Sequence, residues 1–211
     1  MKKLVLFVLT LLPTLVRAAE FGVENAQGVI IYYNYTNNGT ELEVAPHYTD
    51  YSGYKGNIII PEEVTYMNRT RKVTSIGYEA FYYCSELISV VMPNSITNIE
   101  GKAFRSCSQL TSISISENLR SIGGDAFRDC LSLTSLDIPK SVVDIGPSAF
   151  SGCSFLTSVT LQEGVKTIGS YAFERCFRLT SIKIPNSVIT IGEYNQEIKG
   201  KTNVEIIPVS A

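Results

Sequence analysis

The sequence predicts an α/β-type repeat solenoid that is mostly β, with a parallel strand ladder and short helical or 3₁₀ turns. Five near-copies of one 23-residue unit fill residues 76–190 without a gap. A short fixed period of this kind is typical of one supersecondary unit stacked on itself. Within each unit, one half has apolar residues that alternate and the other half has apolar residues at every third position.

Two columns of residues make the period visible, because their members stand 23 residues apart. One column is aromatic and the other is a thiol. The phenylalanines are Phe81, Phe104, Phe127, Phe150 and Phe173, and the cysteines are Cys84, Cys107, Cys130, Cys153 and Cys176. Stacking should turn each column into a ladder of identical side chains inside the core.

The strand half of the unit is the segment L-T-S-V-T-L in the fourth copy. Val159 and Leu161 alternate at period 2, as residues on one face of a strand do, whereas Leu156 does not fit that spacing. The strand should therefore begin just after Leu156. Every unit repeats in the same sense, so neighbouring strands should be parallel and about 4.8 Å apart.

The other half of the unit is expected to form a helical or 3₁₀ turn. Phe150, Cys153 and Leu156 are spaced by three, and Pro147 suits a first helical position. A glycine follows an isoleucine in each unit except the second, where Glu100 takes the place. A glycine there indicates either a positive φ or a close approach of backbones.

The unit I-G-x-x-A-F-x-x-C-x-x-L-T-S-(I/V/L)-x-(I/L)-P-x-x-V resembles the leucine-rich repeats of BspA-like bacterial surface proteins. The resemblance is close over residues 76–192 and loose over 54–75. It implies a right-handed leucine-rich-repeat coil in a secreted or cell-surface protein, often one that adheres to host proteins. It implies no catalytic residues.

Residues 1–18 read as a secretory signal peptide. Lys2 and Lys3 precede a short apolar run, and Ala18 is a small residue at the expected cleavage point. The run is too short to span a bilayer, so we expect no transmembrane segment after cleavage; a buried N-terminal helix is the alternative. Cleavage would leave 15 basic and 20 acidic residues, a net charge of −5 that disfavours nucleic-acid binding.

The repeats, residues 76–192, are flanked by two regions of different pattern. We expect residues 19–75 to form an N-terminal β-rich cap with a partial repeat, including a hairpin at the turn 37–40. The segment Asn57–Pro61 copies the end of a repeat strand. We expect residues 193–211 to form a C-terminal cap, because Asn195 stands where the repeats have alanine; a truncated longer array is the alternative.

The sequence offers no site for catalysis, a metal or a cofactor. The five cysteines share one apolar position, so we expect buried free thiols rather than disulfides, and no C-x-x-C pair is present for a metal. The single histidine, His47, has no argued catalytic partners. We therefore expect a protein that is not an enzyme.

The outward face of the strands is the best candidate for recognition. Its serine and threonine columns repeat so strictly that we interpret their hydroxyls as structural. One column varies from rung to rung, and we predict that it contacts the partner: Val91, Ser114, Asp137, Thr160 and Lys183.

Ten of the twelve tyrosines precede Cys84. One interpretation is an aromatic platform that binds a sugar or peptide. We favour the other, in which the tyrosines fill the half-buried strands of the cap.

Two functions of different class fit these features. The first is a secreted, periplasmic or cell-surface leucine-rich-repeat protein that binds or adheres to a protein or glycan partner, for example one of the host extracellular matrix. The alternative is a structural or assembly component of a cell-envelope complex, contacted through the cap edges. An enzyme with a site in the cap is the least favoured, since only His47 and scattered acidic residues are available.

Overall fold

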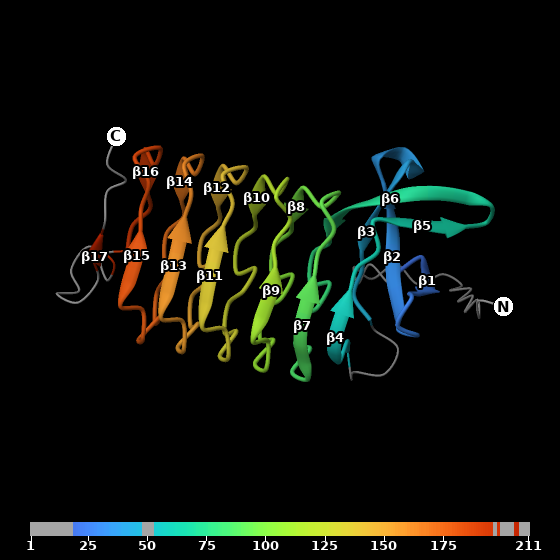
Figure 1. The fold of residues 1–211 in the computed structure, drawn as a ribbon, viewed down its shortest axis with the longest axis horizontal. Coiled ribbons are helices and arrows are strands. Elements are labelled where there is room, and N and C mark those ends of the chain that lie inside the picture. Colours follow the sequence, from blue (N-terminus) through green and yellow to red (C-terminus); the bar gives the residue numbers. More distant parts are fainter. Residues whose placement is uncertain (1–18, 48–52, 196–197, 199–204, 207–211) are drawn as a thin grey trace, which may run out of the picture.

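The protein is a β-solenoid whose coils repeat every 23 residues, closed at one end by a β-rich cap (Figure 1). The computed structural model describes residues 19–47, 53–195, 198 and 205–206. The coils lie side by side along the long axis, and the cap strands occupy the end at the right of the view. The predicted signal peptide lies outside the described residues, as does most of the predicted C-terminal cap.

The predicted parallel ladder forms one face of the solenoid. Its strands are β4 (Gly56–Ile59), β7 (Leu87–Val91), β9 (Ser112–Ser114), β11 (Ser135–Ile138), β13 (Ser158–Leu161), β15 (Ser181–Lys183) and β17 (Glu205–Ile206). The pairing of β7 with β9, of β11 with β13 and of β13 with β15 follows the sequence period, so that Ser135 lies opposite Ser158 and Leu136 opposite Val159. The strand of the fourth unit begins two residues after Leu156, close to the predicted start.

A second parallel ladder, which the sequence analysis did not predict, forms the opposite edge of each coil. Each of its short strands ends on the isoleucine of the repeat. They are β8 (Asn98–Ile99), β10 (Ser121–Ile122), β12 (Asp144–Ile145), β14 (Thr167–Ile168) and β16 (Thr190–Ile191). Two residues are too short for an alternation pattern, so periodicity could not reveal these strands.

The expected helical or 3₁₀ turn does not form in the described repeats, and the α/β label is not confirmed. In the fourth unit the segment is a series of β-turns, with Ser148 at φ 55° and Gly152 at φ 77°. Left-handed residues cannot continue a right-handed helix. The N–H of Ser151 bonds within the turn to Ser148 (3.1 Å), whereas that of Phe150 bonds to Ala172 of the next coil (2.8 Å). The described residues contain almost no helix, and the right-handed sense of the coil stays a prediction.

The glycine after each isoleucine serves close packing, not a positive φ. At Gly146 a Cβ atom would lie 2.6 Å from the backbone nitrogen of Gly124 in the preceding coil. The glycines at this position do not have positive φ. Of the two explanations derived from the sequence, the close approach of backbones therefore holds.

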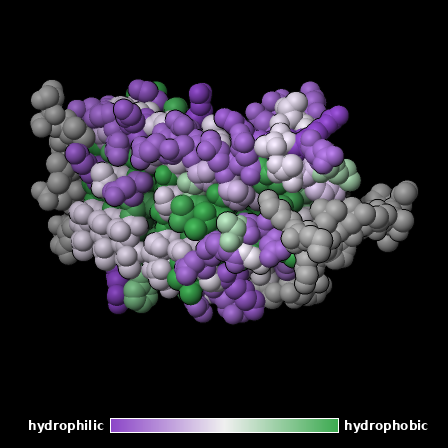
Figure 2. Space-filling view, turned by 45° about the vertical axis from the view of Figure 1, so that its right-hand side comes forward, coloured by the Kyte–Doolittle hydropathy of each residue, from purple (hydrophilic) through white to green (hydrophobic). Residues whose placement is uncertain are grey.

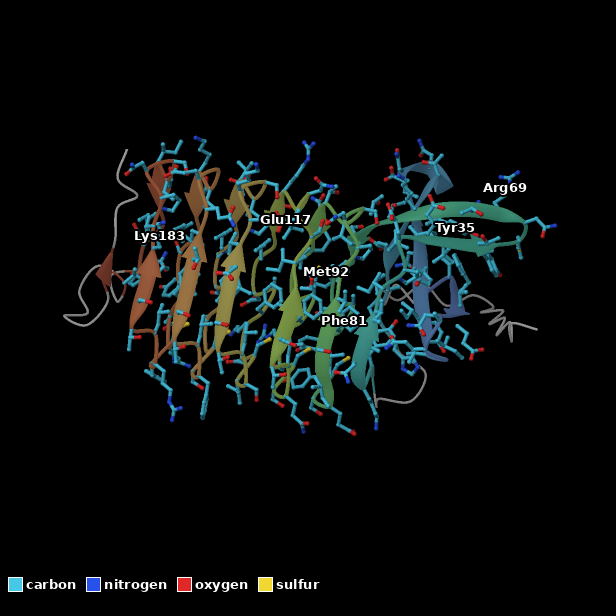
Figure 3. The ribbon with its side chains drawn as sticks, viewed as in Figure 1. Tyr35, Arg69, Phe81, Met92, Glu117 and Lys183 are labelled. Carbon is cyan, nitrogen blue, oxygen red and sulfur yellow. The ribbon has the colours of Figure 1, made fainter. Side chains whose placement is uncertain are left out.

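The phenylalanine ladder is present and runs one rung further than the repeats. Neighbouring rings are stacked, with centroids 4.8–5.4 Å apart from Phe81 to Phe173. Tyr54 of the cap packs on Phe81 at 4.7 Å, and Figure 3 shows Phe81 near the β4 end of the stack. The hydroxyl of Tyr54 donates to the carbonyl of Ala45 (2.9 Å) and accepts from the N–H of Tyr32 (3.0 Å). The aromatic core is thus tied to the cap strands.

The five cysteines are buried and free, as predicted. The Cys130 thiol donates to the Phe104 carbonyl of the preceding coil at 3.1 Å, and the Cys153 thiol does the same to Phe127. A thiol at this position can fill an apolar space and also give a second donor to a carbonyl that already accepts from a backbone N–H of its own turn, as the Phe104 carbonyl does from Cys107 (3.2 Å).

We expect the thiols to make stability fall at alkaline pH. Burial raises the pKa of Cys84 to about 11 and raises the pKa of Cys130 well above its usual range. An unfolded thiol ionises near pH 9, so above that pH the unfolded chain binds fewer protons than the folded one. Urea midpoints should be constant up to about pH 8 and should drop between pH 9 and pH 11.

Thiol titration checks the prediction that the five cysteines are buried and free. Ellman's reagent should find no reactive thiol in the folded chain at pH 8 and five after unfolding without reductant. Fewer than four in the unfolded chain would show that disulfides form. Cys130→Ala should make the alkaline drop shallower.

The N-terminal cap begins with an antiparallel sheet: β1 (Phe21–Glu24), β2 (Ile30–Thr36) and β3 (Glu41–Val44). The hairpin expected at the turn 37–40 is present, with the 3₁₀ segment η1 (Asn37–Gly39) at its tip. β5 (Glu63–Tyr66) and β6 (Arg69–Ile76) form a second hairpin, which projects from the end of the solenoid. β3 pairs with β6 in parallel, and β6 with β8, so the cap continues the second ladder.

At the other end, the side chain of Asn195 continues the backbone ladder. In four coils the phenylalanine N–H donates to an alanine carbonyl of the next coil, as Phe150 does to Ala172. For Phe173 the acceptor is the Oδ1 of Asn195 at 3.4 Å, and the Asn195 amide donates to the Gly169 carbonyl at 2.6 Å. Asn195 is 2% exposed. The residue that breaks the repeat pattern thus satisfies the last N–H of the column.

Candidate functional site

The five predicted contact residues lie on one face, on five parallel strands. Val91 is in register with Ser114, Asp137 with Thr160, and Thr160 with Lys183. Thr160 is half-buried and the other four are exposed. The acid Asp137 and the base Lys183 are two rungs apart, as predicted, and Figure 3 shows Lys183 on β15 near one end of the face.

The column extends into the cap by one residue that the sequence analysis missed. Ile59 on β4 lies opposite Val91 and is 48% exposed. With Ile88 and Val91 on β7 it forms the apolar end of the face, and Figure 2 shows hydrophobic surface near the middle of the molecule among polar regions. The signal was available, because Asn57–Pro61 copies the end of a repeat strand.

The face is interrupted between its second and third full strands. Within the described chain, no backbone pairing joins β9 to β11, although the ladder continues on both sides. Ile113 and Ile115 are only half-buried there, whereas Leu136 and Ile138 of the next coil are buried. The second ladder stays closed, since Ser121 remains in register with Asn98 and Asp144.

The interruption leaves a cleft of about 270 Å³ in the middle of the predicted contact column. Its walls carry hydroxyl, carboxylate and amide groups, and isoleucine and leucine side chains contribute apolar surface. The lining residues include Ser112, Ile113, Glu117, Ser135, Asp137 and Gln162. A concave and mostly polar surface is thereby placed between Ser114 and Asp137, which a flat ladder would have set side by side.

The threonine column is structural, as we interpreted it, except at the cleft, whereas in the serine column of the described chain Ser89 bonds to the Asn57 side chain (2.7 Å). The hydroxyls of Thr111, Thr157 and Thr180 donate to backbone carbonyls of the preceding coil at 2.9–3.2 Å. The equivalent bond from Thr134 to Thr111 does not occur in the part of the chain that is described. These hydroxyls therefore stabilise the ladder and offer a partner few free donors.

Most of the described cap tyrosines fill the core, as favoured from the sequence. Tyr32, Tyr33, Tyr54 and Tyr66 are buried. Tyr35 lies under the guanidinium of Arg71, 4.8 Å from its ring centre. An exposed aromatic platform does not form on these strands.

The described residues show no group of three or more histidine, cysteine or carboxylate side chains that could hold a metal ion. Over the same residues, no helix is both long and apolar enough to cross a membrane.

Comparison with known proteins agrees with this architecture. A family profile described as "BspA type Leucine rich repeat region" matches residues 74–197 in six copies. A comparison with curated proteins gives no match.

Several solved structures share the fold. The T. pallidum leucine-rich-repeat protein is 27% identical with a TM-score of 0.66, covering 77% of this chain and 78% of that one. A leucine-rich cell surface protein from Faecalibacterium prausnitzii is 24% identical (TM-score 0.63; 84% and 52% covered). The pneumococcal vaccine antigen PcpA is 21% identical (TM-score 0.59; 81% and 46% covered). The chain spans about half the length of the latter two, whose likeness shows the fold alone.

Proposed function

The chain belongs to the BspA-type leucine-rich-repeat family, and from that premise we propose that it is a surface-associated protein that binds another protein through its strand face. The proposal is a binding protein and not an enzyme. An array that contains both proteins and glycans distinguishes this partner from the alternative, a glycan.

The observation that carries the proposal is the change of chemistry along one exposed column. Its cap end is apolar, with Ile59 and Val91, its middle holds the polar cleft, and its far end carries Lys183. Inward positions repeat because packing requires it, but an outward column has no such constraint. A surface that changes from rung to rung can set the register of a protein partner.

Exchanging the two charges of the column should weaken binding without unfolding the protein. In the variant Asp137→Lys with Lys183→Asp, each charge meets a partner group of the same sign, which we expect to weaken binding about tenfold or more. Both residues are exposed, so the free energy of unfolding should change by no more than about 0.5 kcal/mol. A binding curve checks the expected loss of affinity, and a melting curve checks that the stability is unchanged.

The partner for that test comes from an array of extracellular proteins and glycans probed with residues 19–211. Lys140→Asp is a control, because Lys140 is an exposed lysine beyond the end of β11 and outside the column. Normal binding by the charge-exchanged variant, or a loss confined to cap variants such as Tyr35→Ala, would contradict the strand-face site. If the array captures glycans and no protein, the proposed protein partner is wrong and a glycan partner takes its place.

We also propose that the protein is exported with residues 1–18 as its leader. Support comes from the basic start, the short apolar run and Ala18. The same fold occurs in a cell surface protein of F. prausnitzii. Mass spectrometry of the exported protein should find an N-terminus at Ala19 or within two residues of it, and an intact Met1 would overturn the proposal.

A further inference from the structure

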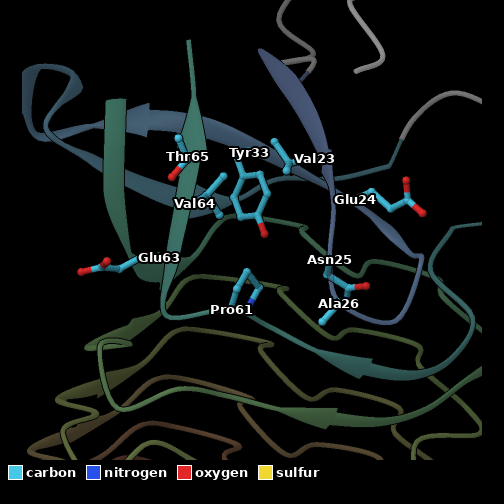
Figure 4. A pocket seen from close by; sticks show the side chains of 9 residues that line it. All are labelled: Val23, Glu24, Asn25, Ala26, Tyr33, Pro61, Glu63, Val64 and Thr65. Carbon is cyan, nitrogen blue, oxygen red and sulfur yellow. The ribbon is translucent and has the colours of Figure 1, made fainter. Parts of the chain in front are cut away.

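The cap contains a pocket of about 500 Å³, away from the strand face (Figure 4). It lies between the end of β1, the turn that follows it, and β5. The lining residues are Val23, Glu24, Asn25, Ala26, Tyr33, Pro61, Glu63, Val64 and Thr65. Its volume lies within the range of small-ligand sites.

The hydroxyl of a buried tyrosine, Tyr33, faces this pocket. The ring of Tyr33 is fully buried beside Phe21, and its hydroxyl points toward Pro61 and Asn25 in Figure 4. Within the described structure this hydroxyl forms no hydrogen bond, unlike that of Tyr54, which forms two. A hydroxyl that faces a pocket and has no protein partner is free to bond with water or with a ligand.

The remaining polar groups of the pocket are chiefly acceptors. The Asn25 side chain is occupied, since it accepts from Gln27 and Val29 and donates to Ile59 at 2.9–3.0 Å. Glu24 and Glu63 are left, and their carboxylates point outward on opposite sides of the pocket in Figure 4. Neither forms an ion pair in the described structure, and no lining residue is basic; Lys72 lies opposite Glu63 in the β5–β6 hairpin. This polar surface favours a cation.

The apolar walls favour a cation with an aliphatic stem. Val23, Ala26, Pro61 and Val64 line the space between the mouth and the Tyr33 hydroxyl. Lysine and arginine bury their methylene chains against such surface while the charged end keeps polar partners. Burial raises the pKa of Tyr33, so the phenol stays neutral at physiological pH and its oxygen can accept from an N–H donor.

We propose that the cap pocket binds a lysine or arginine side chain of a partner protein. The charged group would donate to the Tyr33 hydroxyl, with Glu24 and Glu63 attracting it at the mouth. The pocket shares no lining residue with the strand-face column, so each site is tested by its own variants.

The first test asks whether the Tyr33 hydroxyl is dispensable for folding. Tyr33→Phe removes a group without a partner, so the melting temperature should be unchanged or higher. Tyr54→Phe is the matched control, because it removes a hydroxyl with two hydrogen bonds and should lower the melting temperature. An equal loss in both variants would show that the Tyr33 hydroxyl is structural and would overturn the proposal.

The second test measures binding directly, by amide NMR shifts of residues 23–26 and 63–65. The probes are Nα-acetyl-lysine N-methylamide, the matching arginine compound and the uncharged norleucine compound. The two basic probes should give saturable shifts that weaken at high salt, and norleucine should give none. Tyr33→Phe should weaken binding about tenfold, the effect of losing one charge-assisted contact. Glu24→Gln with Glu63→Gln should weaken binding and make it less sensitive to salt.

Three outcomes would overturn the proposal. They are equal binding of norleucine, the absence of saturable shifts with either basic probe, and tighter binding of a free polyamine such as spermidine. The last would identify a small cation in place of a protein side chain. Normal probe binding by the strand-face variant Asp137→Lys with Lys183→Asp would confirm that the two sites are independent.

Discussion

Replacing Phe127 by alanine should lower the free energy of unfolding by about 3–5 kcal/mol. Phe127 is the middle ring of the phenylalanine ladder, fully buried, and stacked on Phe104 at 5.0 Å and on Phe150 at 5.4 Å. The substitution removes the buried ring and leaves a cavity that both neighbours line. The strand ladder joins the coils of Phe127 and Phe150, and the second ladder and the turn hydrogen bonds from Phe104 to Ala126 and from Phe127 to Ala149 join all three coils, so collapse into the cavity should be limited.

Urea unfolding monitored by circular dichroism measures this loss. Phe177→Ala is the control: Phe177 is 71% exposed and its loss should cost no more than about 0.5 kcal/mol. The place of Phe81 in the first full repeat predicts a milder loss from the sequence alone. Because Tyr54 packs on its other side, Phe81→Ala should instead be nearly as severe as Phe127→Ala. A loss at Phe127 no larger than at Phe177 would mean that the ladder is wrong.

Gly123→Ala should cost about 3 kcal/mol, at the upper end of the range for overpacking. A Cβ atom there would lie 2.5 Å from the nitrogen of Gly101 and 2.6 Å from the carbonyl carbon of Glu100. Both contacts are backbone atoms of the adjacent coil, which cannot turn aside as a flexible side chain can. The coils would have to separate locally, at the expense of ladder hydrogen bonds.

The neighbouring glycine provides the matched control. In Gly124→Ala the new Cβ would meet Pro147 at 3.4 Å, near ordinary contact distance, and the equivalent position holds Tyr78, Pro147 and Ser170 in other units. Its effect on the urea midpoint should be small. Comparable losses at the two glycines would contradict the explanation by close backbone approach.

The sequence by itself determined the architecture of the repeats. A spacing of 23 residues places Phe127 between Phe104 and Phe150, and it places Cys130 in line with the other thiols, whatever the detailed path of the backbone. It also determined that Val91, Asp137 and Lys183 face outward together, because alternation along a strand assigns each residue to one side. These features depend on period and alternation, which a sequence shows directly.

Only the tertiary structure decided how the rest of each coil is built. Spacing by three at Phe150 and Cys153 fits both a helical turn and a series of β-turns, and hydrogen bonds to the next coil select the β-turns. The interruption between β9 and β11 and the cap pocket at Tyr33 bring together residues from different coils or strands. Neither follows a period, because both depend on which backbone and side-chain groups remain unpaired after the neighbouring elements have packed.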